Sequence, residues 1–320
     1  MKAAICTKYG IPGDVVQIAD VEKPVPKDSE VLIKVRAASI NPLDWRFMRG
    51  KPAIGRLAFG LRKPKITRPG VDVAGQVEAV GRNVTQFKPG DEVFGVCRGS
   101  FAEYACAAEE KLEHKPANIS FEDAAAVPVA ALTALQGLRD KGRIQSGHKV
   151  VVDGASGGVG TFSVQIAKSF GTEVTAVCST RNVETARSIG ADHVIDYTRE
   201  DFTKSGQRYD LIMGANAYHS IFDYRRALTQ SGIYVIVGGG LARIFQTMLL
   251  APFLSRIGNK KICFFVANIN KKDLVLLRDL LEAGKVVPVI DRRYPLSGVA
   301  EALLYAEDGH ARGKVVITNS

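Results

Sequence analysis

The clearest chemical signal in the sequence is a glycine-rich stretch that follows a short run of apolar residues. Residues 149–153 are an expected buried strand, and residues 159–170 are an expected helix. The glycines between them let the backbone approach a pyrophosphate, and the helix N-terminus offers it free N–H groups. This context predicts a dinucleotide site; a purely structural turn is the alternative. The predicted contact residues are Ser156, Gly157, Gly158 and Val159.

The end of the next expected strand, residues 173–178, indicates which dinucleotide is bound. An NAD site carries an acidic residue there, which accepts a hydrogen bond from the ribose 2′-hydroxyl. This chain instead has Ser179, Thr180 and Arg181, and no carboxylate follows Glu173 until the next expected helix. Arginine pairs with phosphate in a fork geometry. The sequence therefore favours NADP(H) over NAD(H), with an exposed residue at a helix start as the alternative role for Arg181.

Two patterns of expected elements position these residues in an α/β protein. Residues 1–119 contain short strands broken by proline and glycine, which indicates a small β-rich barrel. From Phe121 onward, apolar strands alternate with helices, which indicates a doubly wound parallel sheet covered on both faces. The expected division is residues 1–120, residues 121–266, and residues 267–320 as a possible return to the first domain.

Three local expectations accompany this division. Residues 122–139 are an expected helix that Pro128 kinks. Residues 241–257 show apolar spacings of three and four with basic flanks, typical of an amphipathic helix that Pro252 breaks. This segment could cover a substrate pocket, form a dimer face, or lie on an anionic membrane surface. Residues 285–290 are an expected strand.

The charge distribution is uneven. The chain has 43 Lys and Arg against 33 Asp and Glu, a net charge of +10. Residues 45–71 and 224–272 contain basic residues and no acidic one. Such stretches attract anions, which include a phosphorylated cofactor, an acidic substrate and anionic lipid, or they are simply solvated faces. No nucleic-acid-binding motif accompanies the charge, so we expect no nucleic-acid partner.

Several motifs in order along the chain resemble the medium-chain dehydrogenase/reductase family, in its zinc-free quinone oxidoreductase branch. The matching segments are residues 39–44, 69–75, 88–91, 129–134, 157–160, 190–192 and 312–316. The resemblance covers essentially the whole chain. It implies a GroES-like catalytic domain, a Rossmann domain, and a homodimer.

The resemblance also implies further contacts with the cofactor. Each of these residues could instead be an ordinary loop or core residue. The implied positions are Thr133, Tyr197, Gly238, Gly239, Ala267, Asn268, Gly313 and Lys314.

A catalytic zinc is not expected. In zinc-dependent members of the superfamily, a cysteine and a histidine hold the metal, and by motif register these positions are Asn41 and Val71 here. An amide is a poor zinc ligand and valine is none. The five histidines show no metal-ligand spacing.

The resemblance implies hydride transfer from NADPH to a quinone or an α,β-unsaturated carbonyl. Without a Lewis acid, the negative charge on the acceptor oxygen needs a hydrogen-bond donor, and the Asn41 amide is one candidate. Asp44 and Asp72 are interpreted mainly as residues that orient the barrel loops, or as structural caps. A reversible NADP-dependent alcohol/carbonyl dehydrogenase and a non-catalytic NADPH-binding protein remain alternatives.

Several features predict a cytoplasmic protein. The N-terminus lacks the apolar core of a secretory signal. The five scattered cysteines fit a reducing compartment. No apolar run is long enough to cross a bilayer.

Overall fold

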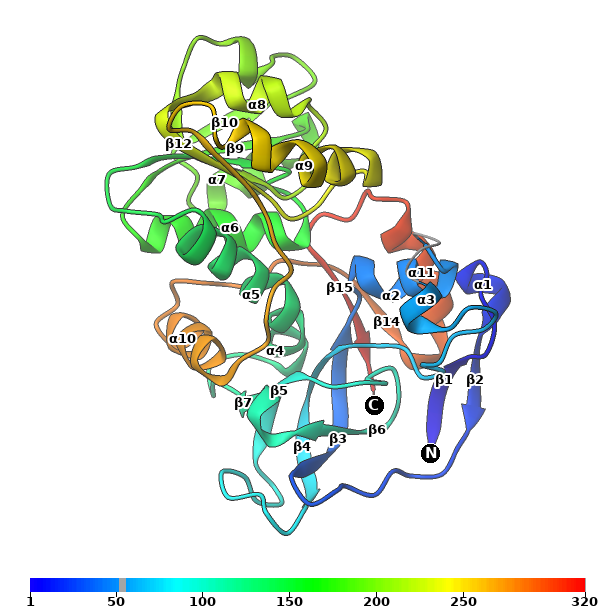
Figure 1. Ribbon diagram of the computed structural model, residues 1–320. Coiled ribbons are helices and arrows are strands. Elements are labelled where there is room, and N and C mark those ends of the chain that lie inside the picture. Colours follow the sequence, from blue (N-terminus) through cyan, green and yellow to red (C-terminus); the bar gives the residue numbers. More distant parts are fainter. Residues whose placement is uncertain (52–55, 320) are drawn as a thin grey trace. The chain divides into compact units, whose positions relative to one another are not determined.

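The structure is a computed structural model that describes residues 1–51 and 56–319 (Figure 1). The few residues of the basic stretch 45–71 that fall at 52–55 lie outside the described part. The chain forms two compact units. The first unit comprises Met1–Val129, Ile269–Glu282 and Pro288–Ser320, and the second comprises Ala130–Asn268 and Ala283–Val287.

The second unit is built on a six-stranded parallel sheet. Its strand order is β10-β9-β8-β11-β12-β13, so the chain reverses direction across the sheet between β8 and β11. Ligands of such sheets bind beyond the carboxyl ends of the strands at this reversal. The strands are β8 (Lys149–Asp153), β9 (Glu173–Cys178), β10 (His193–Asp196), β11 (Tyr209–Gly214), β12 (Leu228–Ile236) and β13 (Lys261–Phe264).

Helices connect these strands, as the near-continuous burial of β8, β9 and β11 requires. The apolar residues of β8 and β9 are buried on both faces of the sheet, and α6 packs against both strands. The helices are α5 (Pro128–Gln136), α6 (Gly158–Ser169), α7 (Val183–Ser188), α8 (Ile221–Ala227) and α9 (Leu241–Leu254). A π-helical turn covers Gly137–Lys141, and 3₁₀ turns cover Thr180–Asn182 and Phe202–Lys204.

The first unit contains a seven-stranded sheet to which both ends of the chain contribute. Its order is β14-β15-β3-β4-β5-β7, and β6 also pairs with β3. Figure 1 shows β15, near the red end of the chain, beside β3 in blue, and the two pair antiparallel. The strands are β3 (Glu30–Ser39), β4 (Asp72–Val80), β5 (Glu92–Val96), β6 (Tyr104–Ala108), β7 (Leu112–His114), β14 (Ile290–Pro295) and β15 (Lys314–Thr318).

Short elements complete the first unit. A separate two-stranded sheet pairs β1 with β2. The remaining elements are β1 (Lys2–Cys6), β2 (Val16–Asp20), α1 (Pro12–Val15), α2 (Pro42–Arg49), α3 (Arg56–Phe59), α4 (Phe121–Ala126), α10 (Lys271–Glu282), α11 (Val299–Glu307), and 3₁₀ turns at Glu109–Lys111 and Leu296–Gly298.

The structure bears out one of the three local expectations and corrects two, and each involves a proline. The expected helix 122–139 is interrupted at Val127, directly before Pro128, as the expected kink requires: α4 ends at Ala126 and α5 begins at Pro128, a position where the missing N–H costs nothing. Pro252 does not break the second segment, since it lies inside α9, which continues to Leu254. Residues 285–289 are not a strand; β14 begins at Ile290, after Pro288, which has no N–H for a sheet ladder.

Within the described residues, no helix is long and apolar enough to span a bilayer.

Candidate active site

The glycine-rich turn forms an open cradle in the second unit. Gly154 has a φ of +86°, and a Cβ on Gly160 would lie 2.0 Å from the Gly154 carbonyl oxygen, so a side chain fits neither position. Gly157 precedes α6, and no side chain caps that helix N-terminus. Residues 156–159 are partly exposed. Free N–H groups at a helix N-terminus fit a pyrophosphate, so the residues present suit the cofactor that the sequence predicts.

The ends of β9 and β10 lie beside this cradle in the sheet. The Thr180 hydroxyl donates to Oδ2 of Asp196, 2.6 Å away. The other Asp196 oxygen accepts from the backbone N–H and the hydroxyl of Thr198, and Arg199 Nε lies 3.6 Å from Oδ2. The hydrogen bond from Thr180 is the main cause of the lowered pKa of Asp196. Arg181 is exposed at the same strand end.

Two tyrosines lie at the same edge of the sheet. Tyr197 directly follows β10 and is 49% exposed, and Tyr218, in the segment after β11, is 42% exposed. Their ring centroids are 5.7 Å apart. Their planes are tilted by 53°, so each exposed ring offers its own aromatic face, a surface against which a nucleotide base can pack. The sequence predicted Tyr197 as a cofactor contact, and the structure places Tyr218 beside it.

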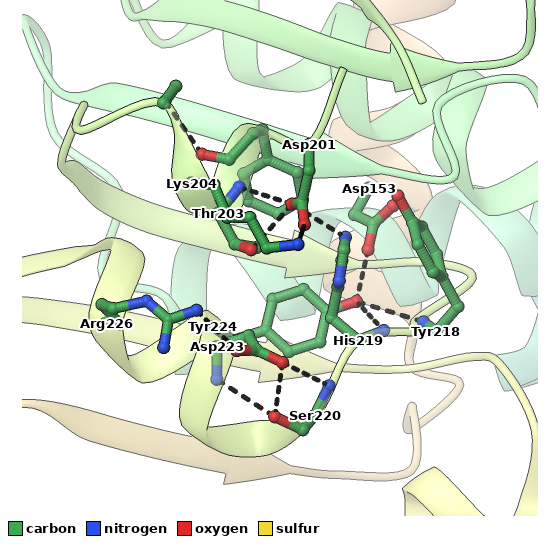
Figure 2. Close-up of polar contacts among 12 residues, drawn as sticks. Asp153, Asp201, Thr203, Lys204, Tyr218, His219, Ser220, Asp223, Tyr224 and Arg226 are labelled. Carbon is green, nitrogen blue, oxygen red and sulfur yellow. Dashed lines mark hydrogen bonds and ion pairs between the residues drawn. The ribbon is translucent and has the colours of Figure 1, made fainter. Parts of the chain in front are cut away.

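A buried polar network supports the glycine-rich turn (Figure 2). Asp153 ends β8, and its carboxylate accepts a hydrogen bond from the Tyr224 hydroxyl. The same hydroxyl accepts from the backbone N–H groups of Tyr218 and His219. Burial is the main cause that raises the pKa of Asp153 to about 7. The network thereby joins the residue before the turn to the segment that carries Tyr218.

The sequence analysis missed Asp153 and Tyr224. An available signal was the carboxylate at the end of an otherwise apolar strand, because a buried carboxylate requires partners. Tyr224 had no comparable signal, since its ring stacks on Tyr234 at a centroid distance of 4.2 Å and resembles an ordinary core aromatic.

The loops predicted to flank the nicotinamide are held closely in the second unit. A Cβ on Gly238 would lie 2.1 Å from the Ala215 carbonyl oxygen, so the loops after β11 and β12 approach without room for a side chain. Gly239 has a φ of +122°. Gln136 donates to the Asn268 carbonyl at 2.7 Å and accepts from the Asn268 N–H at 2.9 Å.

Gln136 was also missed by the sequence analysis. It follows Thr133 by three positions on α5, so the two side chains lie on one face of that helix. Its two hydrogen bonds therefore hold the backbone of the Ala267–Asn268 segment against the helix that carries Thr133.

A second buried polar network lies in the first unit and is called the first-unit network below. It contains three predicted site residues, Asn41, Asp72 and Lys314. Lys314 Nζ donates to Asn41 Oδ1 at 2.7 Å and to the Ile40 carbonyl at 3.1 Å, and it lies 3.3 Å from Asp72 Oδ2. Asn41 Nδ2 donates to the same Asp72 oxygen at 2.9 Å. Ser39 and the backbone N–H of Val129 also donate to Asp72.

The geometry defines what each member can do. Lys314 is 3% exposed and Asp72 is fully buried, so the ammonium group is the counter-charge of a buried carboxylate. Both ends of the Asn41 amide are engaged, and the second N–H of Nδ2 makes no hydrogen bond to the described residues. The resemblance placed Lys314 over the cofactor, whereas here its ammonium group is committed to Asn41 and Asp72. Gly313, with a φ of +128°, is required for close approach, because a Cβ there would lie 2.3 Å from the Val289 carbonyl oxygen.

Asp44 closes the first turn of α2. Its Oδ2 accepts from the backbone N–H of Asn41 at 2.8 Å, and its own N–H donates to the Asn41 carbonyl. This reciprocal pair satisfies a helix N-terminus, as the interpretation of Asp44 as a capping residue expects. Burial is the largest cause that raises its pKa to about 7.

An apolar cavity of about 290 Å³ adjoins α2. Asp44 is the one carboxyl among its described lining residues. The lining comprises Cys6, Leu43, Asp44, Phe47, Met48, Pro64, Ile66, Arg68, Pro69, Gly70, Val71, Val96, Cys97 and Arg98.

These residues do not fit a catalytic zinc. Val71 contributes a hydrocarbon to the cavity wall, and the amide of Asn41 is bound by Lys314 and Asp72. In the described part of the chain, no three His, Cys, Asp or Glu side chains gather where they could hold a metal ion.

The fold, the cradle and the first-unit network together place the chain in the medium-chain dehydrogenase/reductase superfamily. Residues 27–117 match the alcohol dehydrogenase GroES-like domain, and residues 189–317 match a zinc-binding dehydrogenase domain. The chain belongs to the quinone oxidoreductase branch of this superfamily and is an oxidoreductase, as the relatives below establish.

The chain is 34% identical to a chloroplast envelope quinone oxidoreductase homologue of Arabidopsis thaliana, over 99% of this chain and 98% of that protein. It is 35% identical to an NADPH-dependent alkenal/one oxidoreductase of the same plant, over 99% of this chain and 79% of that protein. The solved quinone oxidoreductase of Coxiella burnetii superposes with a TM-score of 0.87 at 28% identity, covering 100% of this chain and 99% of that one.

Proposed function

We propose that this protein is an NADPH-dependent reductase of quinones or α,β-unsaturated carbonyls that works without a metal. The observation that carries the proposal is the first-unit network. Asn41 stands where a zinc enzyme has a metal-binding cysteine, and Lys314 and Asp72 fix its amide. Asn41 is the N-cap of α2, the helix whose Leu43 and Asp44 line the apolar cavity. Relatives named for quinone and alkenal/one reduction support the same chemistry.

The residues at the ends of β9 and β10 favour NADPH over NADH. A ribose 2′-hydroxyl needs a free acceptor, but the carboxylate of Asp196 is already held by Thr180, Thr198 and Arg199. Arg181 supplies a guanidinium at the same edge, which suits a 2′-phosphate. The cofactor contacts are Ser156, Gly157, Gly158, Val159, Ser179, Thr180, Arg181 and Tyr197 on the adenosine side, with Thr133, Gly238, Gly239, Ala267 and Asn268 toward the nicotinamide.

NADPH, when bound, supplies a hydride to the β-carbon of an enone or to a quinone ring. The residues of the chain then have to stabilise the negative charge that reaches the acceptor oxygen. The Lys314 ammonium 2.7 Å from Asn41 Oδ1 polarises that amide and strengthens its remaining N–H as a donor. Asp44, at the cavity wall, holds a proton at neutral pH for part of the time because its pKa is raised to about 7.

The test is a 340 nm assay with a quinone, an enone and an aldehyde, each with NADPH and with NADH. We expect turnover of the first two acceptors with NADPH. Arg181→Leu should raise the KM for NADPH by about 10- to 100-fold, the value of a charged hydrogen bond, and leave that for NADH unchanged. Arg187→Leu, on the exposed face of α7 and paired with Glu184, is the matched control.

Two results would contradict this proposal, and each would indicate a different function. Oxidation of alcohols or reduction of the aldehyde, without turnover of quinone or enone, indicates a carbonyl dehydrogenase. Binding of NADPH, detected by its fluorescence, without turnover of any acceptor indicates a non-catalytic binding protein.

We also propose a homodimer that joins two copies at β13 and α9. β13 ends the described sheet, so its outer edge is free to pair with another strand. On α9, Leu249 is 70% exposed and Phe253 is 63% exposed. Sedimentation of Leu249→Glu should yield a monomer. A native chain that is monomeric but floats with anionic vesicles would instead assign α9 and its basic flanks to a membrane surface.

A further inference from the structure

Two arginines stand in the wall of the cavity beside α2, whose other lining is almost wholly apolar. Arg68 is half-buried and Arg98 is exposed. The backbone segments next to the two arginines are hydrogen-bonded to each other. Cys97 N–H donates to the Val71 carbonyl and Gly99 N–H donates to the Gly70 carbonyl, both at 2.9 Å. These bonds hold the segments that carry the two arginines side by side.

The Gly99 backbone brings the two stems together. Gly99 has a φ of +80°, and a Cβ built on it would lie 3.0 Å from Cβ of Arg68. Arg68 therefore packs against the residue that follows Arg98. The two arginines are therefore neighbours in the fold, and both are among the residues that line the cavity.

No carboxylate in the described part of the chain pairs with Arg68 or Arg98. The contrast within the same unit is Arg49, which makes a bidentate bond to Glu307 with an N–O distance of 2.8 Å. The basic stretch 45–71 supplies no acidic residue nearby in sequence. Two uncompensated guanidiniums at one wall of a cavity form a site for an anion.

The other polar groups of the lining do not cancel this positive charge. Asp44 is the one carboxyl among the described lining residues, and its pKa is raised to about 7. Burial also raises the pKa of the Cys6 and Cys97 thiols above the ordinary value. Both cysteines therefore remain neutral, and they do not consume an electrophilic enone, because the thiolate is the nucleophile.

We infer that the acceptor reduced by this protein carries a carboxylate, which Arg68 and Arg98 bind while its apolar enone or quinone occupies the cavity. The inference rests on the proposed function and names its substrate class. The cavity of about 290 Å³ has the volume of about ten water molecules. It therefore suits a compact acceptor of about that number of non-hydrogen atoms.

The experiment compares two probes of nearly equal shape, one with a carboxylate and one with a neutral amide at the same end. (E)-6-Oxohept-4-enoic acid and its primary amide share the same enone, and two methylene groups separate the alkene from the acid. We expect kcat/KM for the acid to exceed that for the amide by about 10- to 100-fold, as for a charge-assisted hydrogen bond. In Arg68→Met/Arg98→Met the ratio should fall to about one. Arg62→Met, exposed and outside the cavity lining, should keep the ratio.

A binding readout separates recognition from turnover. The saturated 6-oxoheptanoate should inhibit the native enzyme competitively against the enone, and the double variant should lose this inhibition. Its urea midpoint should stay close to that of the native protein, because neither arginine side chain makes a hydrogen bond or ion pair to another described residue and methionine keeps the apolar stem.

Equal rates for acid and amide in the native enzyme, or a ratio that survives in the double variant, would overturn the inference and leave the proposed function intact. Absence of turnover with both probes and with every quinone tested would overturn the proposed function itself. In that case, charge-selective competition for a bound apolar dye would still report on Arg68 and Arg98.

Discussion

Replacement of Lys314 by methionine tests the first-unit network directly. The substitution preserves an unbranched side chain of similar length and removes the charge. It deletes the donor to Asn41 Oδ1 at 2.7 Å and leaves Asp72 without a counter-charge. Asp72 keeps its bonds from Ser39, Asn41 and the Val129 N–H, so the variant should still fold.

The expected loss in the free energy of unfolding follows from the burial of the Lys314–Asp72 ion pair. Removal of one partner from a buried ion pair costs about 3–5 kcal/mol, because the other charge is left in a low dielectric. The three remaining donors place Lys314→Met at the lower end, about 3 kcal/mol. Lys2→Met is the matched control, since Lys2 and Asp20 form a 2.6 Å pair whose side chains are both exposed. Exposed pairs contribute about 0–1 kcal/mol.

The assay is urea unfolding followed by tryptophan fluorescence. Trp45 is the single tryptophan of the chain and lies on α2 in the first unit, so the signal reports on that unit. Lys314→Met/Asp72→Asn, which removes both charges, should be more stable than Lys314→Met. Equal losses in Lys314→Met and Lys2→Met, or a double variant less stable than the single one, would refute the electrostatic reasoning.

Three further predictions follow from the second unit and from the metal position. Burial raises the pKa of Asp153 to about 7, so the folded protein holds this proton more tightly than the unfolded chain. Its stabilising contribution is present at acid pH and is lost between pH about 4 and about 7. Asp153→Asn should therefore lose less stability than the native protein as pH rises through this range; parallel urea-midpoint profiles would contradict this. Gly160→Ala should weaken NADPH binding at least about tenfold by fluorescence titration, since van der Waals overlap at 2.0 Å forces the turn to move. Gly240→Ala, with open space around its Cβ, should bind normally. Prolonged EDTA treatment should leave enone reduction unchanged because Asn41 and Val71 are unsuited to zinc, and loss of activity restored by zinc would refute this.

The sheet of the second unit was predictable because each of its strands is marked by the residues of that strand alone. Parallel strands buried on both faces appear as continuous apolar runs, and the strands at 149–153 and 173–178 are confirmed as β8 and β9. The proline positions were harder, because the effect of proline depends on whether it starts a helix, as at Pro128, or lies near its end, as at Pro252. That distinction depends on flanking contacts that a sequence pattern does not contain.

The predicted site residues were identified by type, but their partners were not. Asn41 and Lys314 are 273 positions apart in the chain, so no local pattern relates them. Tyr224 and Asp153 are separated by 71 positions. Each pairing exists because a sheet brings distant strands into register. In one unit β15 pairs with β3, and in the other β11, which leads into α8 and Tyr224, pairs with β8.

In the proposed reaction, the first-unit network takes the place of the metal. A catalytic zinc supplies a fixed positive charge where negative charge develops. Here the fixed charge is the ammonium group of Lys314, held by three oxygen atoms and balanced by Asp72. Because Asp72 neutralises it, this charge acts through the polarised amide of Asn41 rather than as a Lewis acid. Such a weaker electrophile suits an acceptor whose negative charge is delocalised through a conjugated system, and it is poorly suited to stabilising a localised alkoxide.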